Sequence, residues 1–101
     1  MIFYNVTCNV GRSIADEWII WMKEEHLPEV MATGMFISHT FCQLLTEAAD
    51  NEGLNFTIQY KLNTMSHLDQ YNLEFGPSLK QKTLDRWGEQ VLAFRSVMEE
   101  V

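Results

Sequence analysis

The chain has 101 residues, of which 47% are hydrophobic, so we expect residues 1–101 to form a single domain with a packed core. It carries 7 Lys and Arg against 14 Asp and Glu, a formal charge of −7. This acidity argues against nucleic acid and against anionic membrane surfaces as partners, because both are bound through clusters of Lys and Arg.

The first half of the chain predicts a strand, a helix and a second strand. Apolar and polar side chains alternate over residues 2–10, as in a half-buried strand. Residues 14–26 place their apolar side chains on one broad arc of a helix. Pro28 predicts the end of this helix, because proline disfavours helical geometry at the residue before it. Gly34 then turns the chain towards a strand over residues 36–48, whose two faces are both partly apolar.

The second half predicts a hairpin, two helical segments and a last strand. Residues 50–53 read Asp-Asn-Glu-Gly, a turn sequence, and residues 56–62 alternate cleanly as the strand after it. A helical region over residues 64–87 is interrupted before Pro77, which suits the first turn of a continuing helix. Residues 91–98 then form a strand that is apolar on both faces apart from two polar residues.

This order of elements predicts an α+β fold, the ferredoxin-like βαββαβ plan. One four-stranded antiparallel sheet has its first and third strands in the centre, and both helical segments cover one face. Cys8 and Cys42 then lie on strands that are not neighbours, too far apart for a disulfide. A reducing cytoplasm is the simplest setting for such a chain.

The uncovered face of this sheet is predicted to be apolar at its edges and polar at its centre. Such a face is covered when two copies pair across a two-fold axis, so the sequence predicts a homodimer through the open sheet face. The alternative is a monomer with a partly polar exposed sheet, which antiparallel sheets allow.

Three stretches of the chain resemble a known family. They are MIFYNVTCNV at the start, DEWIIWMKEEHLPEVMATGMF after it and RWGEQVLAFRSVMEEV at the end. They resemble a small bacterial family of unknown function, whose members are similar to the dimeric α/β-barrel superfamily. The resemblance covers nearly the whole chain and implies a ferredoxin-like monomer that dimerises sheet to sheet. The superfamily includes cofactor-free monooxygenases, haem-degrading enzymes and proteins without known activity, so no catalytic residue carries over.

Six residues are candidates for a ligand pocket between the helices and the sheet, and each has a structural interpretation beside the functional one. They are His39, His26, Trp18, Trp21, Tyr60 and Arg95.

The two histidines are the candidates for proton transfer. His26 and Glu29 could form an acid–base pair or two metal ligands, but Pro28 disturbs the helical geometry this needs. The simpler interpretation is that His26 favours the helix end by its charge and that Glu29 is solvated. His39 shares a strand face with Phe41, where it is either a polar group lining an apolar cavity or an edge residue satisfied by a neighbour or water.

The aromatic candidates and Arg95 also allow two interpretations. Trp18, Trp21 and Tyr60 could line a pocket for a flat aromatic ligand, but aromatic residues at helical spacing belong more often to the core. Arg95 is the one cation on the apolar last strand. It could bind an anionic ligand, or it could pair with a carboxylate across the sheet or the dimer.

The chain has no phosphate loop, nucleophile elbow, zinc pattern or marked haem ligand, so the sequence predicts no cofactor and no metal site. The first hypothesis is a small homodimeric binding or interaction protein without catalysis. The alternative is a cofactor-independent monooxygenase-like enzyme, or a binder of a small apolar or aromatic ligand. A cavity of roughly several hundred Å³ at His26 or His39 favours the alternative. A space filled by Trp18, Trp21 and neighbouring side chains argues against it.

Overall fold

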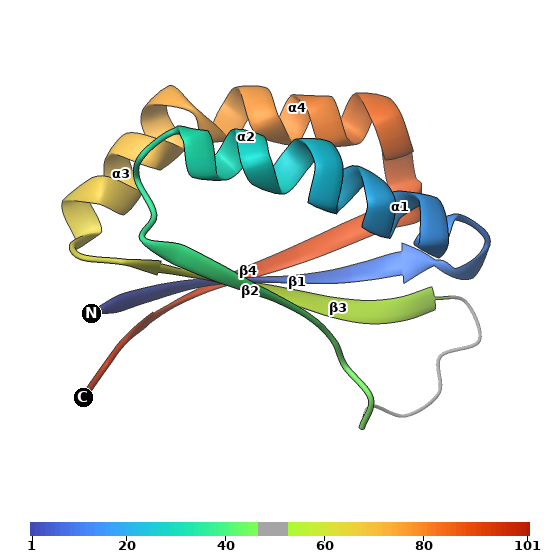
Figure 1. Cartoon of the computed structure of the whole chain (residues 1–101), viewed down its shortest axis with the longest axis horizontal. Coiled ribbons are helices and arrows are strands. Elements are labelled where there is room, and N and C mark those ends of the chain that lie inside the picture. The colour runs from blue at the N-terminus through green and yellow to red at the C-terminus, as the bar shows by residue number, and fades with distance from the viewer. Residues whose placement is uncertain (47–52) are drawn as a thin grey trace.

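The computed structural model describes residues 1–46 and 53–101 of the chain. Four strands form one antiparallel sheet in the order β2-β3-β1-β4. The described helices all lie on one face of this sheet (Figure 1). The predicted ferredoxin-like α+β fold is confirmed, with the first and third strands in the centre. The strands are β1 (Ile2–Gly11), β2 (Ser38–Gln43), β3 (Gly53–Leu62) and β4 (Val91–Glu99).

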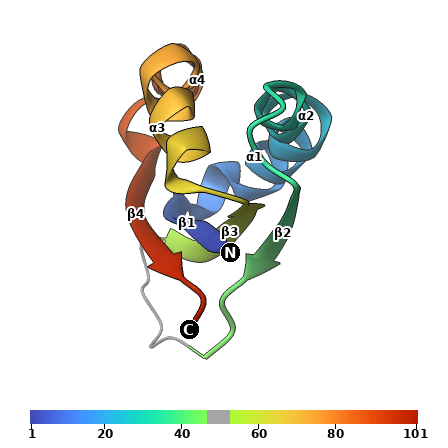
Figure 2. The same ribbon diagram turned by 90° about the vertical axis from the view of Figure 1, so that its left-hand side faces the viewer.

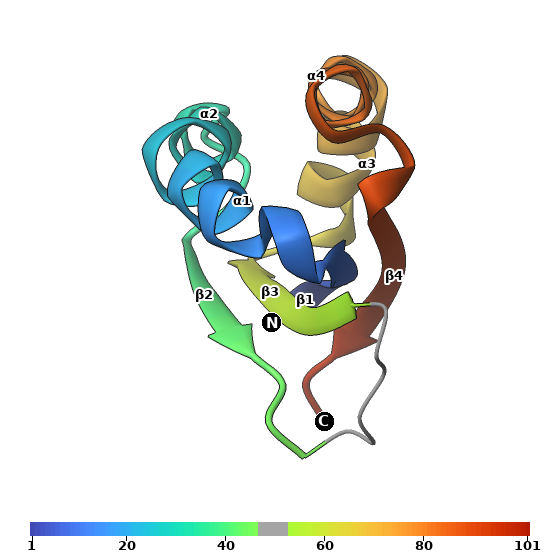
Figure 3. The ribbon, with the colours of Figure 1, turned by 90° about the vertical axis from the view of Figure 1, so that its right-hand side faces the viewer.

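The helices form two rows above the sheet. The first row contains α1 (Ala15–Trp21) and α2 (Leu27–Ala32), and the second contains α3 (Met65–Glu74) and α4 (Gly76–Trp87). Seen along the strands, the first row lies on the side of β2 and the second on the side of β4 (Figures 2 and 3). The interruption before Pro77 that the sequence predicted separates α3 from α4.

The first helical row does not end at Pro28, so that prediction is wrong. The helix continues through a π-helical segment, Met22–His26, in which Leu27 donates its backbone N–H to the carbonyl of Met22, five residues earlier. Pro28 has no N–H to donate, and this change of hydrogen bonding places it in the first turn of α2, where the donor is not needed. The row ends after Ala32, and Gly34 makes the turn with a φ of 76°, as the sequence predicted.

The second strand is shorter than the predicted range of 36–48. β2 spans only Ser38–Gln43, and Phe36 lies before it as a buried side chain of the core. Its ring lies 4.7 Å from the ring of Tyr60 and 4.7 Å from that of Tyr71.

Part of the predicted hairpin lies outside the described residues. This applies to residues 47–48 of the strand and 50–52 of the turn. Gly53 is described and opens β3, so this strand starts three residues earlier than the alternation indicated.

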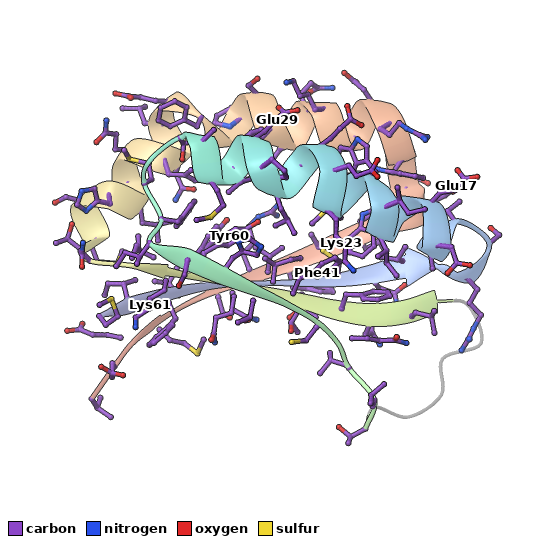
Figure 4. The ribbon with its side chains drawn as sticks, viewed as in Figure 1. Glu17, Lys23, Glu29, Phe41, Tyr60 and Lys61 are labelled. Atoms are coloured by element: carbon purple, nitrogen blue, oxygen red, sulfur yellow. The ribbon has the colours of Figure 1, made fainter. Side chains whose placement is uncertain are left out.

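Strand register decides which side chains face the helices. Four alternate residues of β3 lie on the helix side with at most 4% of their surface exposed: Phe56, Ile58, Tyr60 and Leu62. Figure 4 shows Tyr60 above the sheet and Lys61 below it. Phe41 of β2 pairs with Ile58, so the face of β2 with odd residue numbers meets the helices. The sequence had left this choice open.

The last strand is divided in the same way. Arg95 pairs with Val6 of β1, which places Arg95 on the helix side of the sheet. Phe94 pairs with Thr7 and lies on the open face. Since β4 is an edge strand, its side chains on both faces remain accessible to solvent.

Candidate functional site

A cavity of about 180 Å³ lies between the two helical rows and the sheet. Its walls come from β1, β3 and β4 below and from both helical rows above. The lining side chains with aromatic or polar groups of chemical interest are Tyr4, Trp18, His26, Tyr60, Tyr71 and Arg95.

The mouth of the cavity lies between α4 and β4. The lining residues from these two elements include Lys80, Leu84, Ala93 and Arg95, all of which are exposed. The lining residues from β3 and α1, by contrast, are buried. A ligand would therefore enter past Lys80 and Arg95.

His26 lines the cavity as a neutral imidazole. Its ring stacks on that of Trp21, with the centroids 4.9 Å apart and an interplanar angle of 22°. Burial lowers the pKa of His26 to about 4, and Arg95 adds to this effect while Glu29 opposes it. The interpretation of His26 as a charged residue at a helix end is wrong, because the helix continues past it. At neutral pH the unprotonated ring nitrogen can accept a hydrogen bond.

Glu29 is not available as an acid–base partner for His26. Its carboxylate accepts a hydrogen bond from the Nζ of Lys82 in α4 at 2.7 Å. Figure 4 shows Glu29 on the side of the helices that faces away from the sheet. The ion pair connects the two helical rows above the cavity.

Arg95 reaches the cavity from the last strand. Burial raises the pKa of the Tyr4 hydroxyl, and the charge of the Arg95 guanidinium close to it opposes this rise. Among the described residues, no carboxylate forms an ion pair with Arg95. The interpretation in which Arg95 pairs across the sheet therefore finds no partner in the described part of the chain.

Three tyrosines give the cavity an aromatic lining, Tyr4 and Tyr60 from the sheet and Tyr71 from α3. The rings of Tyr4 and Tyr60 are stacked with centroids 6.1 Å apart, and the ring of Tyr71 lies 6.3 Å from that of Tyr4. Burial raises the pKa of all three, that of Tyr71 to about 12. Their hydroxyls are therefore neutral at physiological pH and can donate hydrogen bonds.

Trp18 and Trp21 have different places relative to the cavity. Trp18 lines it and is only 1% exposed, so it belongs to the core and to the cavity wall at once. Trp21 stands behind His26 and meets the ring of Trp87 edge-on at 5.9 Å. Trp21 therefore supports His26 and does not line the cavity.

His39 lies outside this cavity. It lines a more open groove of about 350 Å³ along the outer side of the first helical row, together with Lys23 and Phe41. Figure 4 shows Lys23 and Phe41 close together there. The ring of Tyr60, 6.3 Å from that of His39, lies towards the centre of the sheet. The prediction that His39 joins His26 in one pocket is wrong, because the two histidines line different spaces.

Sequence reasoning did not select Lys80. The sequence of α4 nevertheless contains a pattern that could have indicated it: Lys80, Thr83, Leu84 and Trp87 have the spacing of residues on one helix face. The first three of these residues line the cavity. The cation on this face lies towards the sheet, which hydrophobic periodicity alone does not predict.

Two negative observations apply to the described residues. No group of three or more His, Cys, Asp and Glu side chains among residues 1–46 and 53–101 could hold a metal ion. In the same part of the chain, no helix has the length and apolar character needed to span a bilayer.

The sequence matches one protein family along its whole length. Residues 1–101 match the family described as domain of unknown function DUF4286. The chain belongs to this family. No curated protein matches the sequence. The resemblance to a family of unknown function is thereby confirmed, and membership alone assigns no activity.

Solved structures show the same fold at low sequence identity. The chain is similar to HapK from Hahella chejuensis, with a TM-score of 0.74, 9% identity and coverage of 100% of this chain and 93% of that one. A putative antibiotic biosynthesis monooxygenase from Deinococcus radiodurans has a TM-score of 0.69, 12% identity and coverage of 100% and 93%. A dimeric ferredoxin-like protein from an uncultured marine organism has a TM-score of 0.67, 12% identity and coverage of 100% and 95%. These likenesses show the fold and no more.

Proposed function

We propose that this protein is a homodimeric binding protein for a small apolar or aromatic molecule, held in the cavity between its helices and its sheet. The observation that carries the proposal is the cavity of about 180 Å³. Trp18 and Met22 line this space without filling it. An engineered apolar cavity of about 150 Å³ binds benzene, so a space of this size admits one aromatic ring.

The lining of the cavity suits such a ligand. Binding pockets are mostly apolar and aromatic, with a few polar groups that set the orientation of the ligand. Here the tyrosine rings, Trp18 and Ile58 supply the apolar and aromatic surface, while His26 and Arg95 supply polar groups.

A titration with neutral single-ring compounds tests the binding proposal. Phenol and benzyl alcohol should raise the melting temperature and change the tryptophan fluorescence saturably, since Trp18 lines the cavity. Val6→Phe adds a ring to a side chain that lines the cavity and should abolish both effects. Leu73→Phe, at an 81% exposed position of α3, is the matched control and should bind like the parent. No saturable response up to about 10 mM, or an equal response in a folded Val6→Phe variant, refutes the proposal.

The second part of the proposal is the dimer through the open sheet face. Three side chains of β4 form an apolar stripe on this face: Leu92, Phe94 and Met98 are 54%, 71% and 41% exposed. Phe3 of β1 pairs with Met98 and extends the stripe. A second copy across a two-fold axis would cover it. The description of one similar structure as a dimeric ferredoxin-like protein supports this arrangement.

Light scattering at micromolar concentration tests the dimer. The parent should show a mass near twice the 11.8 kDa of one chain. Phe94→Glu places a charge in the stripe and should give the monomer mass. Leu73→Glu introduces the same charge at an exposed position outside the stripe and should remain dimeric. A monomeric parent removes this part of the proposal and leaves the binding cavity untouched.

The two cysteines support a cytoplasmic setting for this protein. Cys8 and Cys42 are free thiols on strands separated by β3, as the sequence predicted. Burial raises the pKa of Cys8 to about 11, so its thiol is protonated at neutral pH. Free thiols persist in a reducing compartment.

A second candidate function is a cofactor-independent monooxygenase-like enzyme. It is favoured by the presence of the neutral imidazole of His26 and the guanidinium of Arg95 in one cavity. The unprotonated nitrogen of the imidazole would accept a hydrogen bond from the hydroxyl of a phenolic substrate, and the guanidinium would stabilise negative charge that develops on the substrate. Oxygen consumption with substituted phenols tests this candidate. Consumption that persists unchanged in His26→Gln contradicts the role assigned to His26.

A further inference from the structure

The net charge of the residues around the cavity is opposite in sign to the net charge of the whole chain. The protein carries a formal charge of −7, yet no Asp or Glu is among the residues that line the cavity. The lining contains two cations, Lys80 and Arg95, both at the mouth. An acidic protein thus presents a locally positive entrance to an apolar space.

The two cations act on one another. The pKa of Lys80 is lowered by burial in the first place and by the charge of Arg95 in addition. No ion pair joins either cation to a carboxylate among the described residues. The nearby Lys82, in contrast, is paired with Glu29 at 2.7 Å. Two like charges that share a partly desolvated entrance repel one another, and a bound anion between them would relieve that repulsion.

Several side chains that line the cavity can donate hydrogen bonds. The indole N–H of Trp18 is buried and has no hydrogen-bond partner among the described residues. The buried tyrosine hydroxyls are neutral, because burial raises their pKa values. Arg95 and Lys80 are donors only. A ligand that pairs with the two cations must carry acceptor oxygens at the mouth.

The volume limits the size of the ligand. About 180 Å³ exceeds by little the space of about 150 Å³ that holds one benzene ring. One ring therefore fits inside against the tyrosines, and a small charged substituent fits at the mouth.

The geometry points to a single-ring aromatic carboxylate as the ligand, with its ring in the cavity and its carboxylate between Arg95 and Lys80. This inference rests on the proposed binding function and adds the charge and the size of the molecule. Arg95 would form the main ion pair, since a planar guanidinium can bind both carboxylate oxygens.

Calorimetric titration of the whole chain with benzoate and with benzamide, its uncharged counterpart, tests the inference. The parent should bind benzoate at least about tenfold more tightly than benzamide, because a hydrogen bond to a charged group contributes more than one between neutral groups. Added salt should weaken the binding of benzoate and leave that of benzamide unchanged.

Variants assign the effect to the two cations. Arg95→Gln should reduce benzoate affinity to that of benzamide, while Arg95→Lys should retain part of the preference because it keeps the charge. Lys80→Gln should produce a smaller loss, since an ammonium lacks the planar guanidinium fork that binds both carboxylate oxygens. Lys82→Gln removes a positive charge from the same helix, where it is paired with Glu29, and should change the affinity by less than about twofold. Circular dichroism verifies that each variant is folded.

The possible results separate this inference from the binding proposal. Equal affinity of the parent for benzoate and benzamide overturns the inference and leaves the binding proposal standing. A preference for benzoate that survives in Arg95→Gln and Lys80→Gln also overturns it. If neither compound binds at up to about 10 mM, both the inference and the binding proposal are wrong.

Discussion

Replacing His26 with glutamine should remove a specific part of the acid sensitivity of this protein. Burial holds the pKa of His26 at about 4, below the 6.5 of an exposed histidine. The unfolded chain therefore binds a proton at His26 before the folded chain does. The sign follows: His26 lowers the stability as the pH falls from 6.5 towards 4, and its contribution is constant below and above this window.

The size of the effect follows from the pKa difference. A pKa of about 4 in place of 6.5 corresponds to about 3 kcal/mol at ~1.4 kcal/mol per unit. His26 is half-buried, so solvent screening reduces the expected value to about 2 kcal/mol. The free energy of unfolding of His26→Gln, relative to the parent, should therefore rise by about 2 kcal/mol between pH 7 and pH 4.

Urea unfolding at fixed protein concentration across this pH range is the assay, since the stability of the proposed dimer would depend on concentration. The matched control is His39→Gln, which removes an exposed histidine from the edge strand β2 and retains His26. This control should lose stability with falling pH as the parent does. A parent and a His26→Gln variant with parallel pH profiles would show that His26 is not buried as a neutral side chain, and the reasoning would fail.

Three further predictions concern the fold. Pro28→Ala should leave the helical circular dichroism signal unchanged and alter the stability by no more than about 1 kcal/mol, since the helix already passes through this position. An increase in the helical signal that corresponds to one or more additional helical turns would contradict this. Gly88→Ala should cost about 1–3 kcal/mol in urea unfolding, because Gly88 has a φ of 58° and a ψ of −137°, a backbone conformation that strains any residue with a Cβ; an unchanged unfolding midpoint would contradict this. Leu62→Ala, at a side chain with no exposed surface, should cost about 2–5 kcal/mol. The same change at the 81% exposed Leu73 should cost at most about 0.5 kcal/mol, and equal costs would contradict the assigned core.

Much of the candidate site was accessible from residue type alone. Six residues were candidates for a pocket between helices and sheet. Of these, Trp18, His26, Tyr60 and Arg95 line the cavity, whereas Trp21 and His39 do not. They were selectable because polar or aromatic side chains in apolar segments stand out in a sequence. Lys80 was not, because a lysine on a helix with many polar residues resembles any solvated lysine until the helix is packed against the sheet.

The alternation of apolar and polar residues determined the strands, and the order of elements determined the ferredoxin-like fold, since these patterns act over a few residues at a time. Tertiary structure alone decided which set of alternate side chains of each edge strand faces the helices. Pairing with Val6 turns Arg95 to the cavity, and a register shifted by one residue would turn it to the open face. Tertiary structure also decided the path of the chain at Pro28. The proline lowers the local preference for helix, but the packing of Leu27 and Val30, which are 3% and 1% exposed, stabilises a helix that continues through it. Local sequence thus determines which elements can form, and packing between distant segments determines which way their side chains point.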